Sequence, residues 1–173
     1  WSPLLPAEMS IKSLDKAKPV AGRMEEIKKG QNFSVFIDYA HTEDALKEAL
    51  LALKSFCQKR IIVVFGCGGD RDKAKRPKMG KVASNLADIV IITSDNPRSE
   101  DPIQILSQIK SGISSPNLYE IVDREKAIKK AISLARKGDI VLIAGKGHET
   151  YQIFKDKTVH FDDREIALVN LNE

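Results

Sequence analysis

Cysteine, aromatic residues and long apolar runs are all scarce in this sequence. It has 2 cysteines, Cys57 and Cys67, so nothing points to a disulfide framework and a reducing, cytoplasmic setting is expected. Aromatic residues make up 6% of the chain, too few for the base-stacking surfaces of proteins that bind single-stranded nucleic acid. The longest apolar runs, Ile61–Phe65 and Ile89–Ile92, are far too short to span a bilayer. We therefore expect neither a nucleic-acid partner nor a membrane partner.

The sequence also lacks the common motifs of nucleotide and metal binding. It contains no G-x-x-x-x-G-K-S/T and thus no P-loop. Gly66, Gly68 and Gly69 lack the spacing of the dinucleotide-binding motif G-x-G-x-x-G. Neither H-E-x-x-H nor a pair of C-x-x-C motifs occurs, which argues against a zinc site. We predict that the chain contributes no metal ligand and no residue that itself catalyses a reaction.

What the chain does have is the composition of a globular domain. Apolar residues make up 42% and charged residues 30% of its 173 residues, and the net charge is +4. This length favours one domain with a substantial core, and the mild positive charge suits anionic small molecules. Residues 1–24 carry early prolines and no regular period, which predicts a linker that enters a domain over residues 25–173. The first residue is Trp1, and no signal-peptide pattern follows it, so the chain is expected to be part of a longer protein.

Short β-branched runs alternate with helical patterns after the linker. Runs without polar alternation are typical of strands buried on both faces, and their alternation with helices predicts a parallel sheet built from βαβ units. The predicted fold is a three-layer, Rossmann-like α/β domain, with a mainly parallel sheet of about six strands and helices on both faces. Thr42 is a predicted N-cap, and the first helix has the predicted apolar stripe Leu46, Leu50, Leu53 and Phe56. The predicted strands are Ser34–Asp38, Arg60–Phe65, Ile89–Thr93, Leu118–Val122, Asp139–Ala144 and an edge strand Thr158–Phe161; the helices are Glu43–Cys57, Lys75–Ala87, Pro102–Lys110, Arg124–Lys137 and Glu165–Leu171.

Compact polar motifs follow four of the predicted strands. In an open α/β sheet, ligands bind beyond the carboxyl ends of the strands. The connections at the opposite edge, such as residues 54–59 and 111–117, have the composition of plain solvated turns. This asymmetry predicts one functional edge, formed by the segments Asp38–Thr42, Gly66–Asp72, Ser94–Arg98 and Gly145–Glu149.

The side chains of these segments suit a ligand that carries both charges. Arg71 and Arg98 can each form paired hydrogen bonds to a carboxylate or a phosphate. Asp95 and Glu149 can accept hydrogen bonds from an ammonium group. Glycines in the same segments let the backbone approach a ligand closely. The chemistry therefore predicts a site for an amino acid that is recognised at both of its charged ends.

Each motif taken alone also has an ordinary structural explanation. Residues 66–72 could form a flexible turn, and residues 95–98 could form a β-turn with a central proline. His41 could be a structural histidine, and Lys146 and His148 could be surface residues. The basic run Lys73–Arg76 is expected to be a solvated helix start. The functional interpretation gains weight because the four segments are predicted to share one edge of the sheet.

Taken together and in order, the motifs resemble those of the Mur ligases, and most closely those of the members that add meso-diaminopimelate. The resemblance covers almost the whole chain and corresponds to the C-terminal third of such a ligase. It implies the fold of a Mur ligase C-terminal domain, which binds the incoming amino acid and closes over ATP. The matching stretches are Gly22–Glu25, Asp38–Thr42, Gly66–Pro77 (GCGGDRDKAKRP), Asp95–Arg98 and Gly145–Glu149.

The resemblance also implies roles for individual residues. Residues 95–98 (DNPR) resemble the signature for meso-diaminopimelate, whose second carboxylate would give Arg98 a partner that lysine lacks. Arg23 and Asp38 would reach the phosphate and ribose of ATP, and His41 would lie near the nucleotide. The residues implied to bind the amino acid are Arg71, Asp95, Asn96, Pro97, Arg98, Gly145 and Glu149.

The reaction implied by the resemblance is peptide-bond formation in peptidoglycan synthesis. ATP phosphorylates the terminal carboxylate of UDP-MurNAc-L-Ala-D-Glu, and the amine of meso-diaminopimelate then displaces the phosphate. ATP and Mg2+ would be bound mainly by a central domain that this chain lacks, so the chain alone is expected to be inactive. Two alternatives stay open: a non-catalytic α/β domain that binds a small ligand or nucleotide, and a related Mur or folylpolyglutamate ligase with another substrate.

Overall fold

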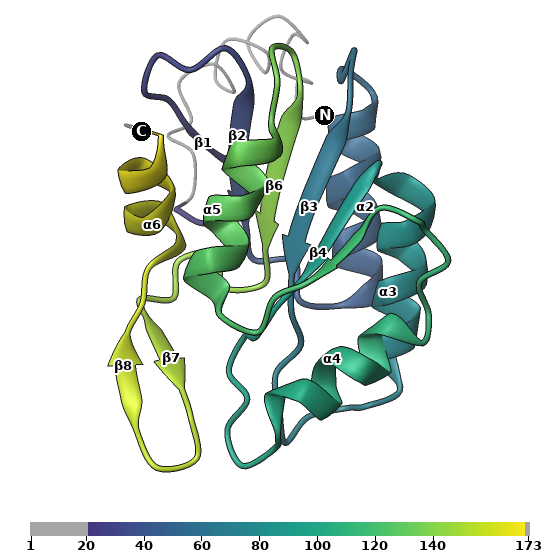
Figure 1. Cartoon of the computed structure of the whole chain (residues 1–173), viewed down its shortest axis with the longest axis vertical. Helices are drawn as coiled ribbons and strands as arrows, with labels where there is room; N and C mark the ends of the chain where they lie inside the picture. Colours follow the sequence, from purple (N-terminus) through teal and green to yellow (C-terminus); the bar gives the residue numbers. More distant parts are fainter. Residues whose placement is uncertain (1–20, 172–173) are drawn as a thin grey trace, which may run out of the picture.

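The computed structural model describes residues 21–171 and has a six-stranded sheet at its centre. Its strands are β1 (Glu25–Ile27), β2 (Ser34–Asp38), β3 (Ile61–Phe65), β4 (Ile89–Ile92), β5 (Leu118–Glu120) and β6 (Ile140–Ala144). They lie in the order β1-β2-β6-β3-β4-β5, and all neighbours are parallel except β1, which is antiparallel to β2 (Figure 1). The mainly parallel six-stranded sheet is confirmed, whereas the predicted linker over residues 1–24 lies mostly outside the described residues.

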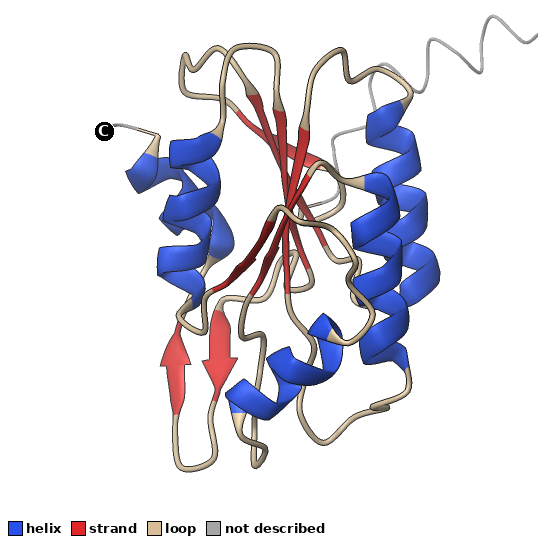
Figure 2. Cartoon of the chain, turned by 45° about the vertical axis from the view of Figure 1, so that its right-hand side comes forward, coloured by secondary structure: helices blue, strands red, loops and turns tan. Residues whose placement is uncertain are grey.

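Helices cover both faces of this sheet and complete the three predicted layers (Figure 2). They are α2 (Glu43–Lys54), α3 (Lys75–Leu86), α4 (Pro102–Lys110), α5 (Arg124–Leu134) and α6 (Asp163–Asn170). One core lies between the sheet and α2, α3 and α4, and the other between the sheet and α5 and α6. Successive residues of a strand alternate between the two cores, as Val63 and Val64 do in β3, which is why the central strands have no polar positions. No helix among residues 21–171 is long and apolar enough to cross a membrane.

A separate hairpin extends beyond the carboxyl ends of the central strands (Figure 1). It consists of β7 (Tyr151–Ile153) and β8 (Thr158–His160), which pair in antiparallel register. The prediction that Thr158–Phe161 is an edge strand of the main sheet is therefore wrong, because its partner is β7. Neither β1 nor β7 was predicted: β1 has the sequence EEI, with two acidic residues, and β7 comes just after the polar segment Gly145–Glu149.

The predicted bounds of α4 are confirmed, α2, α3 and α5 start as predicted but end earlier, and α6 starts two residues before and ends one residue before its predicted bounds. Thr42 is confirmed as the N-cap of α2, and its Oγ1 accepts a hydrogen bond from Ala45 N at 3.3 Å. The helix ends at Lys54, so Phe56 lies outside it and is 55% exposed, not part of the buried stripe. Helix α5 ends at Leu134, three residues before the predicted end, because the chain turns there to enter β6.

Candidate functional site

A pocket of about 560 Å³ lies among the loops that follow β2, β3, β4 and β6. This is the carboxyl edge of the sheet, where ligands bind in open α/β folds. Pro97 lines a neighbouring hollow with Arg98, whereas six of the seven residues implied to bind the amino acid line the pocket. These six are Arg71, Asp95, Asn96, Arg98, Gly145 and Glu149. The structure brings their side chains together, and their role in binding stays a prediction.

The loops after β3 and β4 are packed backbone against backbone. Gly69 N donates to the Asn96 carbonyl at 2.9 Å. A Cβ atom on Gly69 would collide with the Pro97 carbonyl, and one on Gly66 would collide with the Thr93 carbonyl. The glycines of residues 66–72 therefore serve close packing, and this loop is not merely a flexible turn.

The 95–98 loop is fixed from a second side by β7. Gln152 Nε2 donates to the Asp95 carbonyl at 2.7 Å, and Arg98 N donates to the Ile153 carbonyl at 3.1 Å. Arg98 has a φ of 51°, a left-handed conformation that is uncommon outside glycine. Its Nη1 donates to the Gly69 carbonyl at 2.9 Å, so the side chain also reaches the loop after β3. The β7–β8 hairpin, which was not predicted from the sequence, thus fixes the loop that carries residues 95–98 (DNPR).

Two acidic side chains of the pocket retain acceptor capacity. Asp95 is 9% exposed, and its carboxylate accepts no hydrogen bond from residues 21–171. Glu149 Oε2 accepts from Asn96 Nδ2 at 3.1 Å, while within the same described part of the chain Oε1 has no donor. Arg71 lies at the exposed side, where its Nη1 donates to the Asp70 carbonyl at 3.2 Å. Besides Asp72 and Lys75, the pocket therefore contains two guanidiniums and the carboxylates of Asp95 and Glu149, which can still accept from a cation.

Lys146 is fully buried next to this pocket, and not a surface residue. Its Nζ donates to Asn96 Oδ1 at 3.0 Å and lies 3.4 Å from Glu149 Oε2. Desolvation lowers the pKa of Lys146, although the charges of Asp95 and Glu149 oppose this shift. Its place between two glycines of a loop gave no sign of burial in the sequence.

Two buried arginines, Arg76 and Arg124, stabilise the loops at the carboxyl edge of the sheet. Arg76 bonds both oxygens of Glu100 at 2.9 Å and donates to the Gly68 carbonyl at 3.1 Å, so the expectation that Lys73–Arg76 is solvated is wrong for Arg76. The hydrogen bond from Arg76 is the main reason that the pKa of Glu100 is lowered to about 2.

Arg124, the first residue of α5, is the second of these buried arginines. It pairs with the fully buried carboxylate of Asp163 at 2.7 Å and 2.8 Å and donates to the Ala144 carbonyl at 3.1 Å. This contact fixes the last residue of β6 just before the Gly145–Glu149 loop. Both arginines stand in the first turn of a helix, a position that normally faces solvent, and no pattern in the sequence separated them from surface charges.

The three residues implied to contact ATP gather around Tyr39. The guanidinium of Arg23 lies 5.2 Å from the Tyr39 ring centroid, and the His41 ring lies 4.6 Å from it. The carboxylate of Asp38 accepts from Ala40 N and Met24 N, each at 2.8 Å. Asp38 therefore ties the segment that carries Arg23 to the end of β2. Of the three, His41 lines the pocket.

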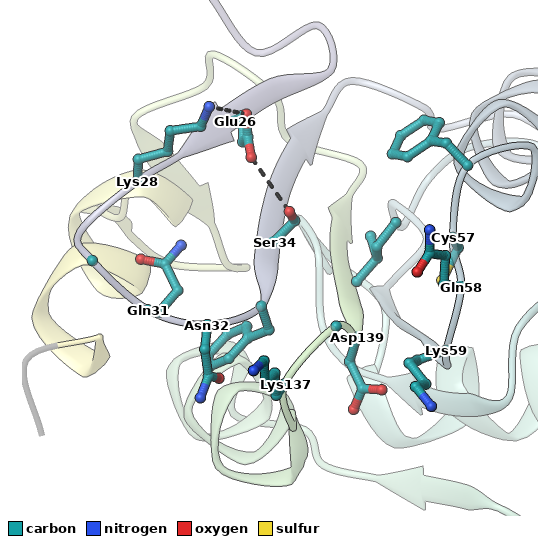
Figure 3. A pocket seen from close by; sticks show the side chains of 15 residues that line it. Glu26, Lys28, Gln31, Asn32, Ser34, Cys57, Gln58, Lys59, Lys137 and Asp139 are labelled. Atoms are coloured by element: carbon teal, nitrogen blue, oxygen red, sulfur yellow. Dashed lines mark hydrogen bonds and ion pairs between the residues drawn. The ribbon is translucent and has the colours of Figure 1, made fainter.

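A second, larger pocket of about 730 Å³ lies at the opposite edge of the sheet (Figure 3). The turn before β3, expected to be a plain solvated connection, forms part of its wall. Its acidic groups are already paired: Glu26 bonds Lys28 at 2.8 Å and Ser34 at 3.3 Å (Figure 3). Asp139 is bound by Arg60. This pocket gathers none of the motifs that the sequence singled out.

The described residues contain no group of three or more His, Cys, Asp or Glu side chains that could hold a metal ion. The charged side chains of the pocket at the carboxyl edge can form ion pairs and hydrogen bonds with a ligand. A parallel α/β sheet with a charged pocket at its carboxyl edge is typical of domains that bind small polar molecules.

The sequence matches the family model described as Mur ligase, glutamate ligase domain, over residues 22–147. The chain belongs to the Mur ligase family. It is 51% identical to the UDP-N-acetylmuramoyl-L-alanyl-D-glutamate–2,6-diaminopimelate ligase of Solibacter usitatus, over 94% of this chain and 33% of that protein. The enzyme of the same name from Clostridium perfringens is 54% identical over 86% of this chain and 31% of its own length. A solved structure of such a ligase superposes with a TM-score of 0.83 at 44% identity, covering 94% of this chain and 34% of that one. The chain thus spans about a third of the length of the curated relatives it matches.

Proposed function

We propose that this chain binds meso-diaminopimelate in an ATP-dependent ligase of peptidoglycan synthesis. The acceptor would be UDP-MurNAc-L-Ala-D-Glu, whose terminal carboxylate is activated by ATP. The observation that carries the proposal is the convergence of Arg71, Arg98, Asp95 and Glu149 on one pocket. The names of relatives about half identical in sequence supply the substrate class.

The charges of the pocket complement this amino acid. Meso-diaminopimelate has two carboxylates and two ammonium groups, and the pocket offers the guanidiniums of Arg71 and Arg98 and the carboxylates of Asp95 and Glu149, with Asp72 and Lys75 also in its lining. Arg98 and Arg71 would bind the carboxylate at the far end, where lysine has none, and Glu149 would accept from an ammonium group. A volume of about 560 Å³ is within the usual range for a site of this kind.

The contribution of these residues to the reaction would be positioning. A bound amine that is held in line with an activated carboxylate reacts as part of one complex, without the entropy loss of a bimolecular encounter. The fixed loops around the pocket suit this task, because Asp95, Asn96 and Arg98 are held by contacts to β7 and to Gly69.

ATP and Mg2+ belong to the proposal as substrates of the whole ligase. Arg23 and His41 are exposed beside Tyr39 and fit the edge of a nucleotide site, with the guanidinium available for phosphate. Asp38 would act less directly, since its oxygens already accept two backbone hydrogen bonds. Most contacts to ATP, and those to Mg2+, would come from an ATP-binding part outside this chain, to which residues 1–24 would lead.

Calorimetric titration of the ligase that carries this chain, with meso-diaminopimelate and with L-lysine, tests the proposal. We expect binding and turnover of meso-diaminopimelate and weak use of lysine. A preference for lysine would contradict the assignment of Arg98, and failure to use either amino acid would contradict the substrate class. The isolated chain is expected to form no ADP from ATP, and detectable ADP formation would contradict the need for a separate ATP-binding part.

A further inference from the structure

The buried cation Lys146 has no assigned part in the proposed site. It is 0% exposed, and it lies in the loop between Gly145 and Gly147, which have φ values of 117° and 55°. Such values suit glycine and disfavour other residues. They let the backbone reverse on both sides of Lys146, and Glu149 N donates to the Lys146 carbonyl at 2.9 Å to close the turn.

Three polar groups meet around the ammonium of Lys146. Asn96 Oδ1 accepts from Lys146 Nζ at 3.0 Å and from Ile153 N at 3.0 Å. This fixes the amide so that Asn96 Nδ2 faces Glu149 Oε2, at 3.1 Å. Lys146 Nζ approaches the same Oε2 at 3.4 Å, and the ring of Tyr151 lies 5.7 Å from Nζ. Lys146 and the backbone of Ile153 therefore fix Asn96 together, and Lys146 and Asn96 both contact one oxygen of Glu149.

We propose that Lys146 is a positioning residue for the amino-acid site: it holds Asn96 and Glu149 Oε2, and so presents Glu149 Oε1 to the ammonium group of the ligand. This inference rests on the proposed function and goes further, because it assigns one oxygen of Glu149 to the protein and the other to the substrate. The positive charge of Lys146 also offsets the electrostatic repulsion between the nearby carboxylates of Asp95 and Glu149.

The substitution Lys146→Met tests this role, since it keeps an unbranched side chain and removes the charge and the donors. In the ligase that carries this chain, we expect the KM for meso-diaminopimelate to rise about tenfold or more, as for the loss of a charge-assisted hydrogen bond. The KM for ATP should rise less than the KM for meso-diaminopimelate, because Lys146 bonds Asn96 and Glu149 directly, whereas Tyr39 contacts this loop at Gly147 and His148. Lys126→Met, on an exposed lysine of α5, is the matched control and should change neither value.

A double-mutant cycle separates positioning from general damage. If Lys146 acts through Glu149, then Lys146→Met should have little further effect on the KM for meso-diaminopimelate in the background of Glu149→Gln. Additive effects of the two substitutions, or equal losses for ATP and the amino acid, would overturn the proposal.

A structure of the unaltered ligase with meso-diaminopimelate gives a test that does not depend on the folding of a variant. We expect a ligand ammonium within hydrogen-bond distance of Glu149 Oε1, while Lys146 Nζ remains on Asn96 Oδ1. Direct contact of Lys146 with the ligand would overturn the positioning role. A ligase that turns over meso-diaminopimelate but shows an unchanged KM in Lys146→Met would sink this inference alone, whereas an unaltered ligase that does not use meso-diaminopimelate would sink the proposed function.

Discussion

The two ends of the central sheet carry pockets of comparable size, about 560 Å³ and 730 Å³, with opposite use of their acidic side chains. At the amino end, both oxygens of Glu26 are engaged by Lys28 and Ser34 (Figure 3). Both oxygens of Asp139 are engaged by Arg60. At the carboxyl end, Asp95 and one oxygen of Glu149 accept nothing from the described residues. Size therefore does not distinguish the two pockets, whereas unused acceptor capacity does.

The difference follows from strand direction. In a parallel sheet, the loops that leave the carboxyl ends are free to vary around the site, while the amino-end turns must start the next strand. Asp139 illustrates the second case, because it receives Arg60 and the Arg136 N–H in the turn before β6. Glu149 illustrates the first, since one of its oxygens is held by Asn96 and the other has no donor among the described residues.

The largest effect is expected from loss of the buried Arg124–Asp163 ion pair behind the carboxyl end. Arg124→Met would leave Asp163 as an uncompensated buried charge and free the Ala144 carbonyl. We expect the free energy of unfolding to fall by about 3–5 kcal/mol, measured by urea denaturation. Lys126→Met on the same helix should cost less than about 0.5 kcal/mol. A loss below about 1 kcal/mol for Arg124→Met would show that this ion pair is not important for stability.

The next largest effect concerns the ligand. Arg98→Ala should weaken binding of meso-diaminopimelate by about a hundredfold, because a paired hydrogen bond to a carboxylate is lost. Lys137→Ala at the opposite pocket removes a cation of similar reach and should leave binding unchanged. Calorimetric titration of both variants of the full ligase compares the two ends directly, and equal losses would contradict the assignment of the site to the carboxyl end.

Neutralising one acidic residue at each end of the sheet, Asp139 and Glu149, tests the same comparison. Asp139→Asn should lower the free energy of unfolding by about 1–3 kcal/mol and leave the KM for meso-diaminopimelate unchanged. Burial alone would raise the pKa of Asp139, but its hydrogen bonds from Arg60 and Arg136 outweigh this and lower it, so the charged form supports the fold.

Glu149→Gln is the complement of Asp139→Asn. It should raise the KM for meso-diaminopimelate and lower the free energy of unfolding less than Asp139→Asn does, since a glutamine oxygen can still accept from Asn96 Nδ2 and Lys146 Nζ. Denaturation and steady-state kinetics on the two variants suffice. A substrate defect in Asp139→Asn or a purely structural defect in Glu149→Gln would remove the distinction between the two ends.

Much of this fold can be predicted from the sequence, because the patterns that indicate its central strands are local. The strands β3, β4 and β6 are short apolar runs, and the polar segments that follow them must meet at one edge because parallel strands share direction. The convergence of residues 95–98 with residues 145–149 follows from that rule. The strands β1 and β7 were not predicted because β1 has two acidic residues among its three and β7 adjoins a polar loop.

The buried charges were not predictable in the same way. Arg76, Arg124 and Lys146 are 0–1% exposed, and each has the residue type and local context of a surface cation. Their partners Glu100, Asp163 and Asn96 come from distant parts of the chain, so burial arises from tertiary pairing. A sequence motif also does not show which oxygen of Glu149 lacks a donor. That depends on the contacts of Lys146 and Asn96 to Glu149 Oε2.

The smallest expected effect is a pH dependence at the carboxyl end. Glu100 has a pKa lowered from 4.5 to about 2, chiefly by its hydrogen bond from Arg76. Because the pKa in the folded state lies below its ordinary value, the charged form stabilises the fold fully above pH 4.5, and this contribution is lost as the pH falls toward about 2.

Glu100→Gln should therefore remove part of the pH dependence of the free energy of unfolding between pH 4.5 and about 2. Glu120→Gln breaks a more exposed ion pair with Lys110 and should leave that dependence nearly intact. Urea denaturation at several pH values measures both. Glu100 also accepts from Asp70 N at 2.7 Å, so its protonation should loosen the loop after β3. If the free energy of unfolding depends on pH in the same way in Glu100→Gln and in the unaltered chain, then the Arg76–Glu100 pair does not contribute to the loss of stability in acid.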